Sequence, residues 1–284
     1  MSLRFGYGLN GFTDHRLEDA LAVLADLGYD GVALTLDHAH LDPFTPDLAG
    51  RSARVAALLA RHGLGVVVET GARYVLDPWR KHEPTLVSDQ GRDRRIDLLE
   101  RAIRVAAEVG SPAVSFWSGI APAGPGHAEL WSRIEDAVTR LLPVAEAHDI
   151  VLALEPEPGM FVERIADVHE LRRRLGHPHH LRLTIDVGHL RCTEDADPAD
   201  CVLGAGDLVA NVQIDDMRRG VHEHLPFGEG EVDFPPVLAA LAAVEFDGLV
   251  AVELPRHSHA APALAASSLE FLRHAARRPQ EVGR

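Results

Sequence analysis

Short hydrophobic runs alternate with longer amphipathic stretches along the whole chain. The short runs contain few polar residues, which is typical of parallel strands that are covered on both faces. Eight such runs are predicted to be strands: residues 3–8, 31–36, 65–69, 113–117, 151–155, 181–186, 208–214 and 249–254.

The stretches between these runs repeat their apolar residues at intervals of three and four, which is the period of an amphipathic helix. Residues 16–28, 47–63 and 93–110 follow this pattern and each end in glycine, the usual residue just past a helix C-terminus. Residues 129–149 and 261–277 follow it less regularly. The segments after the fifth and sixth runs are weaker as helices, so their boundaries are less well defined.

Strands and helices that alternate eight times in roughly 250 residues are typical of a (β/α)8 TIM barrel. We therefore predict an α/β fold in which residues 1–284 form a single domain, since no linker or low-complexity tract interrupts the pattern. A doubly wound open sheet is the alternative. That fold usually has a Gly-x-Gly-x-x-Gly motif after its first strand, and "GYGLNGF" does not match it.

Composition excludes several classes of function. The net charge of −15 argues against nucleic acid as a partner, because binding to phosphates needs a basic surface. No apolar run approaches the ~20 residues of a membrane span, so no membrane association is expected. Cys192 and Cys201 form no disulfide framework, which favours a cytoplasmic location. Lys81 is the only lysine, which makes Schiff-base chemistry improbable.

Acidic residues stand at the ends of several predicted strands. Glu155, Asp186 and Glu253 end the fifth, sixth and eighth strands, and strand C-termini form the active-site face of a TIM barrel. Three carboxylates held close together and partly dehydrated repel one another unless a cation or protons intervene. Because oxygen ligands suit Mg, Mn or Co, with Zn as a further option, the pattern predicts a divalent-metal site.

The chain resembles the xylose-isomerase-like TIM-barrel superfamily over its whole length. The motifs that carry the resemblance are "LALEPEPG", "TIDVGHL", "VQIDD", "HLPFGEGEVDF" and "VAVELPR". The branch in question contains sugar phosphate isomerases and epimerases, tagatose-type epimerases and inosose dehydratases. The resemblance implies that one divalent metal ion is bound by Glu155, Asp186, Gln213 and Glu253.

Gln213 is a departure from the superfamily, whose members often have a histidine at this point of the seventh strand. Because glutamine offers a neutral carbonyl oxygen, the expected ligands are all oxygen atoms, which favours Mn or Mg and leaves Co or Zn as alternatives. If Gln213 instead weakens the metal site, the chain would be a non-catalytic sugar-binding barrel.

The resemblance also implies a reaction. We expect a metal-dependent isomerase or epimerase that moves a proton beside a carbonyl of a small ketose, a sugar phosphate or a cyclic polyol ketone. Glu155 and Glu253 are the expected catalytic pair, by resemblance to the epimerases. A lyase or dehydratase of the inosose type on the same metal site is the alternative. The expected partner is therefore a small sugar or polyol, and the fold is compatible with a homo-oligomer.

Further residues are predicted to contact the substrate. Residues 70–92, between the third strand and the third helix, have few helical signals and are expected to form a lid or an oligomer contact. Endonuclease IV, a distant member of the superfamily that acts in DNA repair, needs histidines after strands three and four. This chain has none there, so DNA repair is not expected. The predicted substrate-binding residues are His189, His224, Glu157, Trp117, Arg73, His40 and His222.

Overall fold

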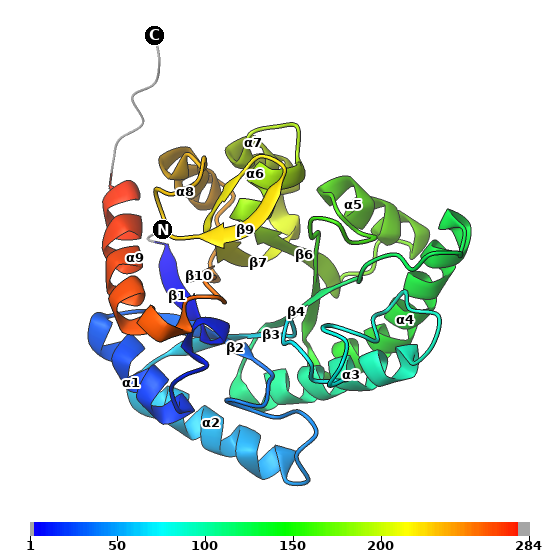
Figure 1. Ribbon diagram of the computed structural model, residues 1–284, viewed down its shortest axis with the longest axis horizontal. Coiled ribbons are helices and arrows are strands. Elements are labelled where there is room, and N and C mark those ends of the chain that lie inside the picture. The colour runs from blue at the N-terminus through cyan, green and yellow to red at the C-terminus, as the bar shows by residue number, and fades with distance from the viewer. Residues whose placement is uncertain (1–2, 278–284) are drawn as a thin grey trace.

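The computed structural model describes residues 3–277 (Figure 1). Within them, parallel strands close into a barrel in the order β1-β10-β7-β6-β5-β4-β3-β2. The strands are β1 (Arg4–Gly8), β2 (Gly31–Thr35), β3 (Gly65–Glu69), β4 (Ala113–Trp117), β5 (Val151–Glu155), β6 (Leu181–Asp186), β7 (Val209–Ile214) and β10 (Leu249–Val252). The predicted single-domain (β/α)8 barrel is confirmed, and each predicted strand is found within one or two residues of its bounds.

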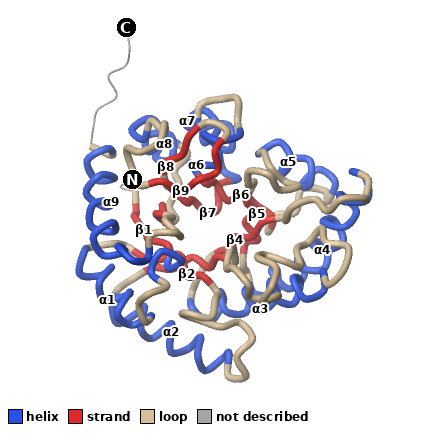
Figure 2. The backbone as a smooth tube through the Cα atoms, viewed as in Figure 1, coloured by secondary structure: helices blue, strands red, loops and turns tan. Residues whose placement is uncertain are grey.

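Helices form a ring around the barrel (Figure 2). As predicted, the first three end at glycines, Gly28, Gly63 and Gly110. The weak segment after β6 contains two short helices instead of one. The helices are α1 (Leu17–Leu27), α2 (Leu48–His62), α3 (Arg92–Val109), α4 (His127–His148), α5 (Ile165–Arg174), α6 (Val187–Thr193), α7 (Pro198–Ala205), α8 (Phe234–Ala243) and α9 (Ala261–Ala275), with short 3-10 turns η1 (Leu9–Phe12), η2 (Gly206–Leu208) and η3 (Ser258–Ala260).

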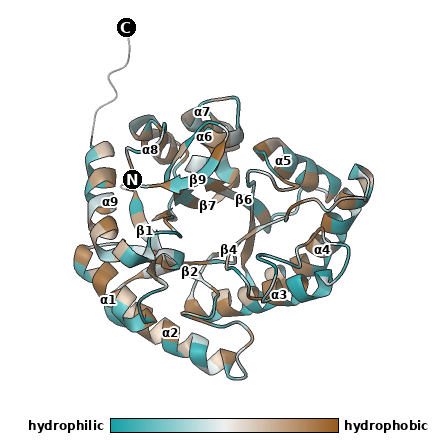
Figure 3. Cartoon of the chain, in the orientation of Figure 1, coloured by the Kyte–Doolittle hydropathy of each residue, from teal (hydrophilic) through white to brown (hydrophobic). Residues whose placement is uncertain are grey.

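Alternate residues of each strand face the helices and the barrel interior. The residues that face the helices are large and apolar and form the main core, and the outer helices show hydrophobic and hydrophilic residues along each turn (Figure 3). The residues that face the barrel interior are small at the bottom, where Ala33, Val67, Ala113, Ala153 and Ala251 pack together. The same interior rows end in polar side chains at the strand C-termini, so the barrel is filled below and polar at its mouth.

A hairpin after β7 was not predicted. It consists of β8 (Asp216–Arg218) and β9 (Val221–Leu225), paired antiparallel outside the barrel. The longer strand of the hairpin, VHEHL, has apolar residues only at its two ends, so it shows no alternation that predicts a strand. Asp216 anchors the turn that follows, since its carboxylate accepts hydrogen bonds from the backbone N–H groups of Gly228 (2.9 Å), Gly230 (2.8 Å) and Val232 (3.0 Å).

The long connection between β3 and α3 folds against the barrel mouth. Arg95, at the start of α3, donates hydrogen bonds to the carbonyl oxygens of Pro84 (3.0 Å) and His82 (2.6 Å), and its guanidinium lies 4.5 Å from the ring of Trp117. His82 packs against the same tryptophan ring, with 5.0 Å between the centroids. The connection therefore reaches the pocket, and its roles as a lid or an oligomer contact stay predictions. No helix between residues 3 and 277 has the length and apolar character needed to cross a bilayer.

Candidate metal and sugar site

A pocket of about 290 Å³ opens at the C-terminal ends of the barrel strands. That volume suits a small polar molecule such as a sugar. The metal and catalytic candidates that line it are Glu155, Gln213 and Glu253; Asp186 lies directly beneath them, fully buried. The predicted substrate-binding residues that line it are Arg73, Trp117, Glu157, His189, His222 and His224.

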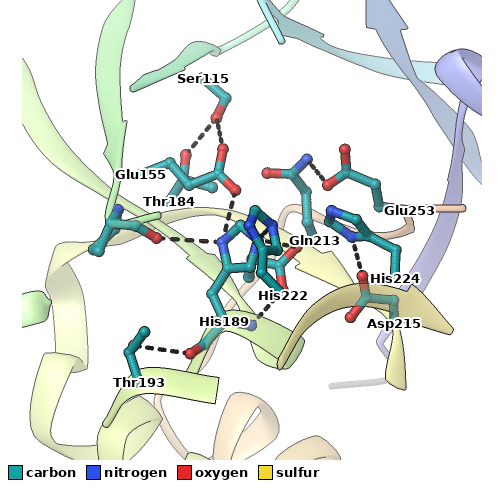
Figure 4. A network of polar contacts seen from close by, with 12 residues as sticks. Ser115, Glu155, Thr184, His189, Thr193, Gln213, Asp215, His222, His224 and Glu253 are labelled. Atoms are coloured by element: carbon teal, nitrogen blue, oxygen red, sulfur yellow. Dashed lines mark hydrogen bonds and ion pairs between the residues drawn. The ribbon is translucent and has the colours of Figure 1, made fainter. Parts of the chain in front are cut away.

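Glu155 ends β5 and points into the pocket above a small polar layer. The hydroxyl group of Ser115 donates a hydrogen bond to Glu155 Oε2 (3.4 Å) and lies 2.9 Å from the hydroxyl of Thr184 (Figure 4). Burial raises the pKa of Glu155 well above its usual value, and repulsion from Glu253 adds to the effect. A carboxyl group in this environment binds a proton more readily than an exposed one. This property suits a general acid or base.

Glu253 follows β10 and is held by two amide groups. Asn10, in the turn η1 after β1, donates to Glu253 Oε1 (2.8 Å), and Gln213 on β7 donates to Glu253 Oε2. The carbonyl oxygen of Gln213 is buried and has no hydrogen-bond partner within the described part of the chain. Burial also raises the pKa of Glu253 well above its usual value. Both amides therefore fix the carboxylate, while one oxygen of Gln213 stays available.

Asp186 ends β6 and caps helix α6. Its Oδ1 accepts a hydrogen bond from the backbone N–H of His189 (2.9 Å), which places the imidazole of His189 in the first turn of the helix. The other oxygen, Oδ2, is buried and unpaired among residues 3–277. The spacing Asp-x-x-His thus arises from an N-cap, and it leaves one carboxylate oxygen of Asp186 free to bind a ligand.

The hairpin brings two more imidazoles over the pocket. His222 and His224 are two residues apart on β9 and face the same side of the strand. His222 Nε2 lies 3.1 Å from His189 Nε2, and His224 Nδ1 is hydrogen-bonded to the buried carboxylate of Asp215 (Figure 4). Burial lowers the pKa of His189 to about 4 and that of His222 to about 3. Both rings are therefore neutral near pH 7.

Gly188 makes room for Asp215. A β-carbon at position 188 would lie 1.9 Å from Asp215 Oδ1, so only glycine fits at this position of the motif. Burial, reinforced by repulsion from Asp186 and Asp216, raises the pKa of Asp215 well above its usual value. Gly188 of the motif thus leaves room for the Asp215 carboxylate that holds His224 of the hairpin, while Asp186 of the same motif positions His189.

Glu157 lies two residues beyond Glu155 and also lines the pocket. Burial raises its pKa to about 7, while attraction to His224 and Lys81 acts in the opposite direction. Lys81 and Arg73 stand at the mouth of the same pocket. The mouth therefore combines a carboxyl group that titrates near neutrality with two cations.

One predicted substrate contact, His40, does not line the pocket. The ring of His40 is turned away from the pocket, and its Nε2 lies 3.2 Å from the carbonyl oxygen of His15. Asp37 Oδ1 accepts hydrogen bonds from the backbone N–H groups of Ala39 (2.9 Å) and His40 (2.8 Å), which bends the chain so that the two histidines of His-x-His do not face the same way. His38 lines the pocket instead.

Other pocket residues were not predicted at all: Asn10, Asp37 and Arg256. Asn10 follows the first strand in "GYGLNGF", so its place after a strand end was the available signal. Its contact with Glu253 joins residues 243 positions apart, which no local pattern reveals.

The residues at the strand ends fit a hard divalent cation. Two buried oxygens, Asp186 Oδ2 and Gln213 Oε1, have no hydrogen-bond partner in the part of the chain that the structure describes, and the carboxylates of Glu155 and Glu253 line the pocket at the same strand ends. Ligand atoms of Glu155, Asp186 and His189 also lie within 4.8 Å of one another. A buried oxygen atom that accepts no hydrogen bond is free to coordinate a metal ion.

The family model described as "Xylose isomerase-like TIM barrel" matches residues 21–275, nearly the whole chain. The chain belongs to this family. The superfamily predicted from the strand-end motifs is therefore confirmed.

Individual relatives and solved structures give further comparisons. L-ribulose-5-phosphate 3-epimerase UlaE of Salmonella paratyphi C is 25% identical over 244 residues, which cover 83% of this chain and 81% of UlaE. The structure of the 3-keto-D-glucoside 4-epimerase YcjR from E. coli superposes with a TM-score of 0.78 at 19% identity, covering 96% of this chain and 100% of YcjR. The structure of a D-allulose 3-epimerase from Methylomonas sp., in complex with D-allulose, superposes with a TM-score of 0.75 at 22% identity. The match covers 96% of this chain and 97% of the epimerase.

Proposed function

We propose that the protein is a divalent-metal-dependent epimerase or isomerase that moves a proton beside the carbonyl group of a small ketose, a sugar phosphate or a cyclic polyol ketone. The observation that carries this proposal is a pair of buried carboxyl groups with raised pKa values, Glu155 and Glu253, which face one pocket beside the unpaired oxygens of Asp186 and Gln213. The sugar epimerases among the relatives support the same class of reaction.

The residues that would hold the metal ion are Glu155, Asp186, Gln213 and Glu253. All four offer oxygen atoms, so Mn or Mg is the favoured ion, and Co or Zn are the alternatives. When bound, such an ion polarises a carbonyl group and lowers the pKa of the neighbouring C–H bond. Asn10 and Gln213 hold the carboxylate of Glu253 from two sides, so its position is set before a substrate enters.

The chain's own groups carry the proton. One of the two carboxylates removes the proton from the carbon beside the carbonyl, and the other returns a proton to the opposite face of that carbon, which inverts it. Because both carboxyl groups line the pocket, each can act as base in one direction of the reaction and as acid in the other. Such general acid–base catalysis contributes about 10²–10⁴-fold in rate.

The rest of the pocket would bind and orient the sugar. The imidazoles of His189 and His224 and the carboxyl group of Glu157 are placed to bind hydroxyl groups, and the ring of Trp117 forms an apolar wall. Arg73 and Lys81 line the pocket and would bind an anionic group of the substrate. The connection between β3 and α3, which packs on Trp117 through His82, would limit the access of water.

A substrate screen tests this proposal. The metal-depleted protein is reconstituted with Mn and incubated with ketoses, ketose phosphates and inososes, and the products are separated by chromatography. We expect reversible conversion of at least one ketose or ketose phosphate into its epimer, and loss of that conversion in Glu155→Gln. Dehydrated products alone would show a lyase. No conversion across the panel with any of Mn, Mg, Co or Zn would contradict the proposal and favour a binding protein.

A further inference from the structure

We infer that Glu69 is a specificity-determining residue, which binds a hydroxyl group at the end of the substrate remote from its carbonyl group. Glu69 ends β3 and lines the same pocket as the residues named above, but the proposed reaction makes no use of it. The inference rests on the proposed function, since it names the kind of substrate that the pocket takes: a chain or ring with a free hydroxyl group at its remote end.

Glu69 lies across the barrel from the metal and catalytic candidates. Strands β10, β7, β6 and β5 are consecutive in the closed barrel, and they carry or adjoin Glu253, Gln213, Asp186 and Glu155. Strand β3 is opposite β7, because β6, β5 and β4 separate the two on one side and β10, β1 and β2 separate them on the other. A substrate whose carbonyl group is held by the first wall therefore directs its other end toward Glu69.

The carboxyl group of Glu69 is held in place by two hydrogen bonds. The hydroxyl group of Thr35, its neighbour at the end of β2, donates to Oε1, and the backbone N–H of Gly71 donates to Oε2 (2.7 Å). Burial raises the pKa of Glu69, whereas both of these donors favour its charged form. The carboxylate is therefore positioned before a substrate enters.

This carboxylate keeps free positions for further hydrogen bonds. A carboxylate has about four lone-pair sites, and Thr35 and Gly71 fill one on each oxygen. Glu69 is only 4% exposed, yet it forms no ion pair within residues 3–277. A buried carboxylate that serves the fold alone is normally paired with a cation. Because Glu69 lines the pocket, its free lone pairs are available to a ligand.

The negative charge of Glu69 limits which groups can bind there. A carboxylate accepts strong hydrogen bonds from hydroxyl groups and repels phosphate or carboxylate groups. Asp37 lines the same pocket, and its charge acts on Glu69 as a second anion. A hydroxyl group of the substrate is therefore the partner that fits Glu69.

Binding of matched sugars to the manganese-loaded, full-length protein tests the inference. The probes are D-fructose, D-tagatose and the 4-, 5- and 6-deoxy forms of each. Equilibrium dialysis measures their binding and counts each sugar together with any epimer formed from it. In the wild type, one of the three deoxy forms should bind about 10- to 100-fold more weakly than its parent sugar, because it leaves a buried charge without its partner.

Variants then show whether Glu69 causes this discrimination. In Glu69→Gln the parent sugar should lose affinity, and the same deoxy form should bind within about 3-fold of it, since a neutral amide gives up the charge-assisted part of the bond. Thr35→Val removes one donor to the carboxylate and should shift the ratio in the same direction. Glu83→Gln is the matched control, because Glu83 belongs to the same connection but lies outside the pocket, where it accepts a hydrogen bond from Ser88 (2.6 Å). It should discriminate as the wild type does.

The ratio of two affinities within one protein does not depend on the stability of that protein. Equal binding of each parent sugar and all of its deoxy forms by the wild type would overturn the inference. The same discrimination in wild type and Glu69→Gln would overturn it too, as would the absence of binding by every probe. Failure of the proposed function would instead appear as intact discrimination without conversion in the substrate screen.

Discussion

The side-chain amide of Gln213 donates a hydrogen bond to the carboxylate of Glu253, while its own carbonyl oxygen is buried and unpaired within residues 3–277. The two residues come from β7 and the end of β10, which are neighbours in the barrel. Gln213 thus orients a catalytic candidate through its nitrogen and offers an oxygen to a cation. Glutamine at this point of β7 is compatible with a working metal site.

Substitution of Gln213 should change which metal binds. Gln213→Leu removes the oxygen and the support of Glu253, so manganese affinity should fall by about 10- to 100-fold, the usual effect of losing even an outer partner. Gln213→His adds an imidazole and should shift the preference from manganese toward zinc. Competitive metal titration measures both. Unchanged manganese affinity in the leucine variant would show that Gln213 is not a metal ligand.

Asp216 should support stability through the turn that it anchors. Its carboxylate accepts three backbone hydrogen bonds from residues 228, 230 and 232. Asp216→Ala leaves these N–H groups without an acceptor and should lower the free energy of unfolding by at least about 3 kcal/mol. Urea denaturation measures the loss. The exposed Asp247 is the control, and Asp247→Ala should change stability by less than about 0.5 kcal/mol.

Two glycines should respond in opposite ways to alanine. At Gly188 the new methyl group would meet Asp215 Oδ1 at 1.9 Å and Met217 Cε at 2.9 Å, so overpacking should destabilise the protein by about 1–3 kcal/mol. At Gly204, inside α7, no atom lies within 4 Å, and alanine should stabilise by about 0.4–1 kcal/mol. Thermal unfolding distinguishes them. A Gly188→Ala protein as stable as the wild type would show that the contact with Asp215 is not tight.

Glu157 should make the metal-free protein less stable as pH rises. Its pKa is raised from 4.5 to about 7 by burial, so the folded state holds the proton more tightly than the unfolded state does. The stabilisation from this proton is complete below about pH 4.5 and is lost as pH rises to about 7, at a total cost of roughly 3 kcal/mol. Unfolding free energies of wild type and Glu157→Gln, measured from pH 4 to pH 8, should diverge over this range. Parallel curves would contradict the pKa.

The barrel could be predicted because its strands are buried on both faces and are therefore nearly continuous apolar runs. The predicted strands were too long by Leu3, Leu36 and Leu208 and by the two residues after Val252, because apolar residues continue past the strand ends. The strand-end acids could be placed in one pocket because parallel strands bring their C-termini to a single face. The place of Glu155 and Glu253 at the barrel mouth follows from that geometry, whereas their role as a catalytic pair was implied by the resemblance to the epimerases.

The loops could not be predicted in the same way. Whether His38 or His40 faces the pocket depends on the turn closed by Asp37, and Asn10 meets Glu253 only in the folded barrel. The pairing of β8 with β9, which brings His222 and His224 over His189, is likewise a tertiary arrangement. Short polar segments of this kind carry no periodicity that extends beyond a few residues.

Deuterium exchange tests the central claim most directly, namely that Glu155 and Glu253 move a proton beside a substrate carbonyl. The manganese-loaded protein is incubated in D2O with a ketose that it converts, and deuterium at the carbon beside the carbonyl is followed by NMR. We predict exchange in the wild type and a loss of at least about 100-fold in Glu253→Gln that still binds manganese. Exchange at the wild-type rate in that variant would contradict the account.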